Sequence, residues 1–67
     1  MKIYPMAIKR MLYIKMLTQS DLAEKTGLSR GTIFNILHKG ACSVNTARKI
    51  CEALGVDPTE IIEKEDE

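Results

Sequence analysis

The sequence is poor in residues that bind metal ions or form cross-links. Its 67 residues include two cysteines, Cys42 and Cys51, and one histidine, His38. A closed zinc site needs more ligands than this, commonly with two cysteines in a CxxC pair, and that spacing does not occur. The sequence therefore predicts no metal ion. We expect both cysteines to be reduced thiols, with Cys51 in the core and Cys42 in a loop.

Other absences narrow the class of protein. No apolar run approaches the length of a membrane-spanning helix and no signal-peptide pattern is evident, so we expect a cytoplasmic protein without membrane contact. A glycine-rich phosphate loop and a nucleophile beside a histidine are both missing, so an enzyme is not indicated and we expect no cofactor or small-molecule ligand. The composition, 45% apolar and 28% charged with three aromatic residues and no tryptophan, suits one small helical domain.

Charge is divided unevenly along the chain, although the net charge is only +1. Residues 1–56 contain nine lysines or arginines and three acids, which gives +6, whereas residues 57–67 contain one lysine and six acids, which gives −5. A basic body favours contact with a polyanion, and an acidic tail lowers non-specific adhesion to it. Taken alone, this division is best explained as ordinary solvated surface charge.

The most informative stretch is residues 18–40. It predicts two short helices, 19–26 and 30–38, and each begins after a hydroxyl residue that can cap it, Thr18 or Ser29. Gly27 suits the positive backbone angle of a chain leaving a helix. Small and apolar residues are expected to face inward and let the two helices cross closely: Leu22, Ala23, Thr26, Leu28, Ile33, Ile36 and Leu37. This pattern is typical of a helix-turn-helix, whose second helix can enter the major groove of DNA.

The chain resembles the Cro and phage-repressor type of helix-turn-helix proteins, which share the lambda-repressor-like fold. The similarity covers about residues 8–62 and rests on the order and spacing of short motifs: Leu17-Thr18-Gln19, Asp21-Leu22-Ala23, Thr26-Gly27-Leu28-Ser29-Arg30, Thr32-Ile33, Ser43-Val44, Ile50 and Ala53-Leu54-Gly55-Val56. The resemblance implies an all-α bundle of five short helices that binds DNA. Beside it, the basic charge of residues 1–56 supports DNA binding.

The second helix of the motif is expected to contact the bases. One side of it carries Ile33, Ile36 and Leu37, and much of the other side carries polar or small residues that can face base edges. The resemblance places five residues at positions that commonly touch DNA: Ser29, Arg30, Gly31, Thr32 and Asn35. Three more lie at helix ends where phosphate contacts are expected: Thr18, Gln19 and Lys39. Capping alone would also explain Thr18 and Gln19, and solvation alone would explain Lys39.

Several positions depart from the family pattern. Leu12 and Met16 stand where the family often has arginine and glycine, and Gly31 lacks the side chain usually found there. Phe34 replaces a residue that is usually small or polar. We expect its ring to pack against Tyr13 or a partner in preference to a sugar or a thymine methyl group.

The flanking segments complete the domain. Residues 1–5 are expected to form an extended arm, because Pro5 disfavours helix directly before it. A first helix follows at about residues 6–16, and its core stripe is Ile8, Met11 and Leu12. A fourth helix is predicted at 43–54 with a core stripe of Val44, Ala47, Ile50, Cys51 and Leu54. Asp57-Pro58-Thr59-Glu60 predicts a short fifth helix. The domain is assigned to residues 6–63, and the acidic tail, residues 64–67, is expected to fray.

A single helix of this kind covers only a half-site, so DNA binding predicts a homodimer with half-sites about 34 Å apart. Apolar residues outside the motif are candidate dimer contacts, together with Phe34: Ile3, Tyr4, Tyr13, Ile14, Ile61 and Ile62. For the arm, packing on the chain's own body is an equal alternative.

The leading hypothesis is a sequence-specific regulator of transcription acting on double-stranded DNA, with repression and an origin in a phage or mobile element as expectations. The alternative is a protein-interaction module, such as an antitoxin or adaptor, that retains the fold.

Overall fold

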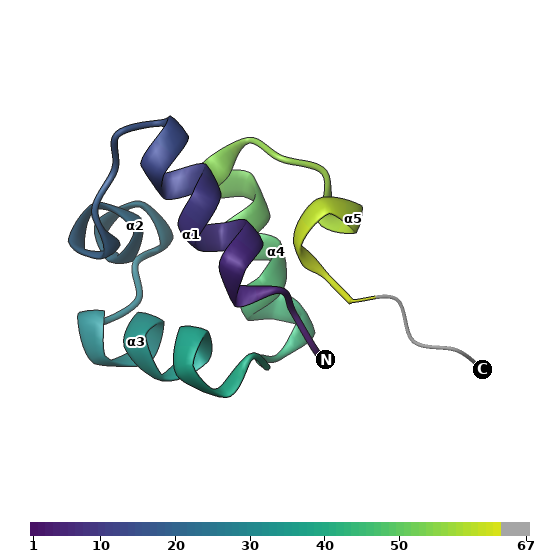
Figure 1. Ribbon diagram of the computed structural model, residues 1–67. Helices are drawn as coiled ribbons and strands as arrows, with labels where there is room; N and C mark the ends of the chain where they lie inside the picture. The colour runs from purple at the N-terminus through teal and green to yellow at the C-terminus, as the bar shows by residue number, and fades with distance from the viewer. Residues whose placement is uncertain (64–67) are drawn as a thin grey trace.

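Five helices follow one another around a common core in the computed structural model, which describes residues 1–63 (Figure 1). The helices are α1 (Pro5–Ile14), α2 (Gln19–Thr26), α3 (Arg30–Lys39), α4 (Val44–Leu54) and α5 (Pro58–Ile61). The predicted all-α fold of five short helices is confirmed. The acidic tail, residues 64–67, lies outside the described residues. Within residues 1–63, no helix combines the length and apolar composition that crossing a membrane would require.

Hydroxyl side chains cap three of these helices. In each case the cap oxygen accepts a hydrogen bond from the backbone N–H three residues later: Thr18 from Asp21 at 3.0 Å, Ser29 from Thr32 at 3.0 Å, and Ser43 from Thr46 at 3.2 Å. These bonds satisfy N–H groups that have no partner within the helix, so they fix where each helix begins. Gly27 ends α2 with φ of +76°, which lets the chain reverse direction and start α3 three residues later.

The core receives apolar side chains from all five helices. The buried set is Ile8, Leu12, Leu22, Ala23, Ile33, Ile36, Leu37, Ala47, Ile50, Cys51, Leu54 and Ile61, together with Ile3 of the arm. The predicted burial of Cys51 is confirmed, and so is that of five inward-facing residues of the helix-turn-helix, whereas the other two, Thr26 and Leu28, are only half-buried. Val44 is a correction, because its side chain is 55% exposed. It stands at the first position of α4, before the part of that helix that carries the buried residues.

The N-terminal arm, residues 1–4, pairs with two distant segments. Four backbone hydrogen bonds hold it: Ile3 N–H to Gly40 O (2.9 Å), Cys42 N–H to Met1 O (3.0 Å), Tyr4 N–H to Ile61 O (2.7 Å) and Glu63 N–H to Lys2 O (2.9 Å). They form two isolated antiparallel bridges, Lys2 with Ala41 and Ile3 with Ile62. The arm is extended, as predicted, and it lies between the end of α3 and the segment that follows α5.

Burial removes two residues from the candidate dimer contacts. Ile3 is 3% exposed and Ile61 is 0% exposed, and both belong to the chain's own core. Neither side chain is available to a second copy, which corrects the expectation for these two residues. For Ile3, the alternative of packing on the chain's own body holds. Tyr4, Tyr13, Ile14 and Phe34 are exposed, and Ile62 is partly buried.

α1 ends at Ile14, two residues earlier than predicted. The reason is Met16, whose φ is +57°, a left-handed conformation that suits glycine far better than methionine. This bend lets the N–H of Leu17 donate to Leu12 O at 2.8 Å and leads the chain into α2. The family resemblance had already marked this position as one where glycine is common.

We predict that Met16→Gly stabilises the protein by about 0.5–1 kcal/mol. The left-handed conformation costs a non-glycine residue about 1–2 kcal/mol, and the greater freedom of unfolded glycine offsets part of that gain. Little packing is lost, because Met16 is 89% exposed. Urea unfolding measures the change. Lys15→Gly is the matched control: Lys15 has φ of −86°, so glycine there should destabilise. A Met16→Gly protein no more stable than the parent would contradict this explanation.

Ile3→Ala should lower the free energy of unfolding by about 2–4 kcal/mol, because it leaves a cavity in the core. The loss should be the same at every protein concentration, since Ile3 packs within its own chain. Lys2→Ala, at the exposed neighbouring position, should change stability by less than about 0.5 kcal/mol. Thermal unfolding over a hundredfold range of concentration tests both variants. If the loss of stability caused by Ile3→Ala grew as the protein was diluted, Ile3 would have to lie in a dimer interface.

Candidate nucleic-acid interface

α3 has one buried side and one exposed side. Ile33, Ile36 and Leu37 are buried against the rest of the bundle. The opposite side is exposed, and we call it the reading face; its residues are Arg30, Gly31, Thr32, Asn35, His38 and Lys39. The three apolar residues anchor α3, which lies at the edge of the bundle (Figure 1). The residues of the reading face are therefore open to solvent.

The turn between α2 and α3 is fixed by a side chain whose hydrogen bonds the sequence did not reveal. The hydroxyl of Thr26 lies 2.9 Å from Leu22 O and 3.1 Å from Ala23 O, to which it donates. The same oxygen accepts from the N–H of Leu28 at 3.3 Å. The position of a threonine in the last turn of a helix was the available signal, because threonine there can bond back to carbonyls one turn earlier. These bonds tie the turn residue Leu28 to the last turn of α2, and so fix how the chain leaves that helix.

The start of α2 carries two of the predicted phosphate contacts, Thr18 and Gln19, and both are exposed. Thr18 forms a capping box with Asp21: its oxygen accepts from the Asp21 N–H, and its own N–H donates to Asp21 Oδ2 at 2.8 Å. The capping role is therefore shown for Thr18. Gln19 lies in the first turn, where outward-pointing backbone N–H groups favour an anion.

The other predicted site residues lie on or beside α3. Ser29 and Thr32 form one hydroxyl pair at the start of the helix, with their side-chain oxygens 2.8 Å apart. Arg30, Gly31 and Asn35 follow along the exposed side, and Lys39 is the last residue of the helix. All eight predicted contacts are exposed. The structure therefore brings six of them together on or beside α3, with Thr18 and Gln19 on the preceding helix.

The chain before and after α3 is basic over a long interval of sequence. No acidic residue occurs between Glu24 and Glu52 in the sequence. The same interval contains five exposed bases, which are Lys25, Arg30, Lys39, Arg48 and Lys49. The turn, α3 and most of α4 thus carry charge of one sign, as contact with a phosphate backbone requires. The absence of acids from residues 25–51 can be seen directly in the sequence.

Phe34 borders the reading face and is 61% exposed. Its ring stacks on that of His38, with centroids 6.1 Å apart and 6° between the ring planes. The expected packing against Tyr13 is thus corrected. His38 follows Phe34 by four residues, so the two side chains are neighbours on the same helix surface.

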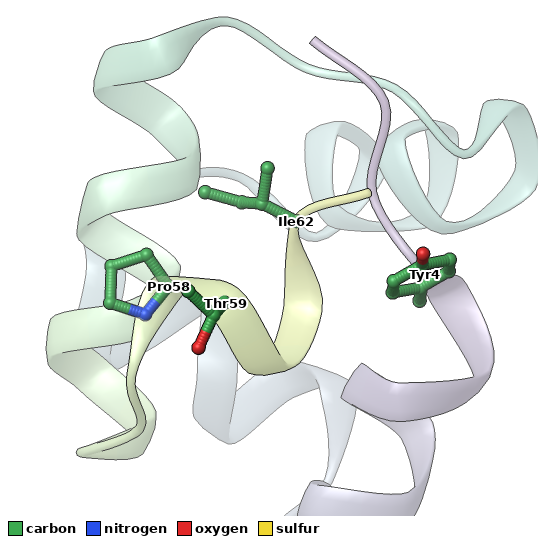
Figure 2. A pocket seen from close by; sticks show the side chains of 4 residues that line it. All are labelled: Tyr4, Pro58, Thr59 and Ile62. Atoms are coloured by element: carbon green, nitrogen blue, oxygen red, sulfur yellow. The ribbon is translucent and has the colours of Figure 1, made fainter. Parts of the chain in front are cut away.

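One apolar pocket lies apart from the reading face. Tyr4, Pro58, Thr59 and Ile62 line an apolar pocket between the arm and α5, and none of the four belongs to α3 (Figure 2). Within residues 1–63, no three His, Cys, Asp or Glu side chains gather as metal ligands would. Burial raises the pKa of the thiols of Cys42 and Cys51, so both stay protonated at neutral pH.

Two carboxylates make the stability depend on acid. The backbone N–H and then the side chain of Thr18 lower the pKa of Asp21, and the same groups of Thr59 lower that of Asp57. A carboxylate with a lowered folded-state pKa stabilises the fold above its unfolded value, about 3.9, and this stabilisation is lost as pH falls through the folded value.

We therefore predict that the melting temperature falls as pH is lowered below about 4. Asp21→Asn should flatten part of this fall, because it removes one of the two titrating caps. Glu24→Gln is the control, since Glu24 takes no part in the capping box. Circular dichroism melts between pH 2 and pH 7 measure the effect. Equal acid sensitivity in Asp21→Asn and the parent would show that the cap does not contribute.

Comparison with known protein families gave one match, to the model of the Cro/C1-type HTH DNA-binding domain, over residues 7–67. Comparisons with curated proteins and with solved structures gave no match. The matched residues include α2 to α5 and all of α1 except its first two residues. The resemblance seen in the sequence is confirmed, and the chain belongs to the family of Cro/C1-type helix-turn-helix DNA-binding domains.

Proposed function

We propose that this protein is a sequence-specific regulator of transcription, a repressor, that binds an operator in double-stranded DNA as a homodimer through α3. The observation that carries the proposal is the reading face: a helix anchored on one side by three buried residues that exposes Arg30, Thr32 and Asn35 on the other. No acidic residue interrupts this part of the chain. The cytoplasm, which holds the DNA of a bacterial cell, is the compartment that fits this role.

The residues of the interface divide into two kinds of contact. Arg30 suits a bidentate pair with guanine, Asn35 a bidentate pair with adenine, and Thr32 the methyl group of thymine. The residues at helix ends suit the phosphates on either side, and they are Thr18, Gln19, Ser29 and Lys39. Base contacts would set the preferred sequence, whereas phosphate contacts would set the position of the domain on the duplex.

Dimerisation follows from the small number of base contacts that one α3 offers. Two copies related by two-fold symmetry would read two half-sites about one helical turn apart. Two apolar groups at the surface support a second copy. Tyr4 and Ile62 lie together on one pocket beside α5, and Tyr13 and Ile14 lie at the end of α1, 84% and 64% exposed. Ile62 is partly buried, and the other three residues are exposed. Occupancy of the operator would then block transcription in proportion to protein concentration.

The operator can be identified by selecting bound duplexes from a pool of random-sequence DNA. Arg30→Ala and Asn35→Ala should each weaken binding to this selected operator by about 1–3 kcal/mol and relax the preference at one base pair. Lys39→Ala should weaken binding to all sequences alike and reduce the salt dependence by about one counterion. Lys9→Ala, which removes an exposed base from α1, is the matched control and should have little effect. Fluorescence anisotropy with the selected duplex and with scrambled duplexes measures each variant.

The proposal would be overturned if Arg30→Ala and Asn35→Ala left every binding activity unchanged. That outcome would favour the protein-interaction module, an antitoxin or adaptor that keeps the fold while its reading face stays unused. All the substituted side chains are exposed, so each variant should keep its fold. Circular dichroism of each variant checks this.

A further inference from the structure

Phe34 is an apolar ring beside polar residues that the proposed function assigns to DNA. Successive residues of a helix turn by about 100°, which places Gly31, Asn35 and His38 opposite the buried side of α3. Around the helix axis, Phe34 lies next to His38, on the way to the buried side, and it is 61% exposed. Its ring therefore lies along the edge of the reading face, where it would meet whatever α3 meets.

The ring is held in place on one side only. His38, one turn later, stacks on it with nearly parallel planes. Side chains on a helix lie over the turn that precedes them, so the other side of the ring faces the turn that contains Arg30 and Gly31, four and three residues before Phe34. The stacking restricts the ring before any partner arrives, which lowers the entropy that binding would cost.

Gly31 leaves an open space on the turn before this ring, and no atom of the Phe34 side chain lies within 4 Å of a Cβ added there. A Cβ added at Gly31 would have Ser29 Oγ, 3.9 Å away, as its nearest neighbour, and the backbone there is ordinary helix. Neither the turn nor the packing of the described residues requires glycine at this position, although alanine would favour the helix. Without a side chain at this position, another molecule can approach the backbone of α3 closely.

We propose that Phe34 and Gly31 form an apolar notch that receives the 5-methyl group of a thymine, which makes Phe34 a specificity-determining residue. The inference rests on the proposed function. The thymine methyl is the apolar group that a base pair presents in the major groove, so it is the group that an aromatic ring on a reading helix can recognise. The acid-free interval around α3 indicates that the partner here is a polyanion.

A protein partner fits this site less well. Arg30 precedes Phe34 by one turn and Asn35 follows it directly, and both are exposed. An apolar surface that covered Phe34 would also remove water from these two side chains without offering them partners, which is unfavourable. The major groove supplies hydrogen-bond partners for both residues beside the methyl group. We therefore assign Phe34 to DNA and not to the dimer contact suggested by the sequence.

The test couples a change in the protein to a change in the DNA. Each thymine of the selected operator is replaced in turn by uracil, which removes only the methyl group. At one thymine per half-site, the parent should bind the uracil duplex about fourfold more weakly, the effect of burying one methyl-sized group. Phe34→Ala should bind the thymine duplex more weakly than the parent and show no further loss with uracil. Met6→Ala, which removes another exposed apolar side chain (70% exposed), should keep the parent's uracil effect.

Gly31→Ala provides a second variant that cannot be weakened by misfolding, because alanine favours the helix. It should fill the notch, lower the affinity for the thymine duplex and abolish the uracil effect. If replacing thymine by uracil changed the affinity of the parent, Phe34→Ala and Gly31→Ala equally at every thymine, the notch would be overturned. The proposed function would not be affected by that result. Conversion of Phe34→Ala to a monomer in sedimentation would overturn the notch in favour of a dimer contact. A parent protein that selects no sequence would overturn the proposed function and the notch together.

Discussion

The close crossing of α2 and α3 is the feature on which the rest of this molecule depends. Ala23, with a side chain of one methyl group, is 4% exposed where the two helices meet. The hydrogen bonds of Thr26 and the left-handed Gly27 set the turn. Because Ile33, Ile36 and Leu37 are buried in this arrangement, the polar side of α3 must face away from the core. The site is thus a consequence of how the core is packed.

The N-terminal arm links this motif to the end of the domain. Its backbone bonds join the residues directly after α3 to those directly after α5, and Ile3 is buried between them. A domain of 67 residues has a small core, so one more buried isoleucine and four hydrogen bonds are a substantial addition. The arm therefore belongs to the structure that supports α3.

The features that were predictable from the sequence are those set by neighbouring residues. The caps at Thr18, Ser29 and Ser43 and the turn at Gly27 follow from side-chain chemistry within a few positions, and the exposed side of α3 follows from helical periodicity. The arm pairing was not predictable, because backbone bridges between distant segments leave no pattern in side chains. α1 ended early because Met16 adopts a conformation that its own preferences oppose. Which surface would form the proposed dimer depends on contacts between two chains, and local patterns in the sequence do not show these.

The central claim is that the exposed side of α3 reads a two-fold symmetric DNA sequence. The most direct measurement is selection by the unmodified protein from a pool of random-sequence duplex DNA at two salt concentrations, followed by sequencing of the bound fraction. Our account predicts binding that weakens steeply with salt and enriches a motif of two inverted half-sites about one helical turn apart. No binding at low salt, or binding that enriches no sequence, would contradict it.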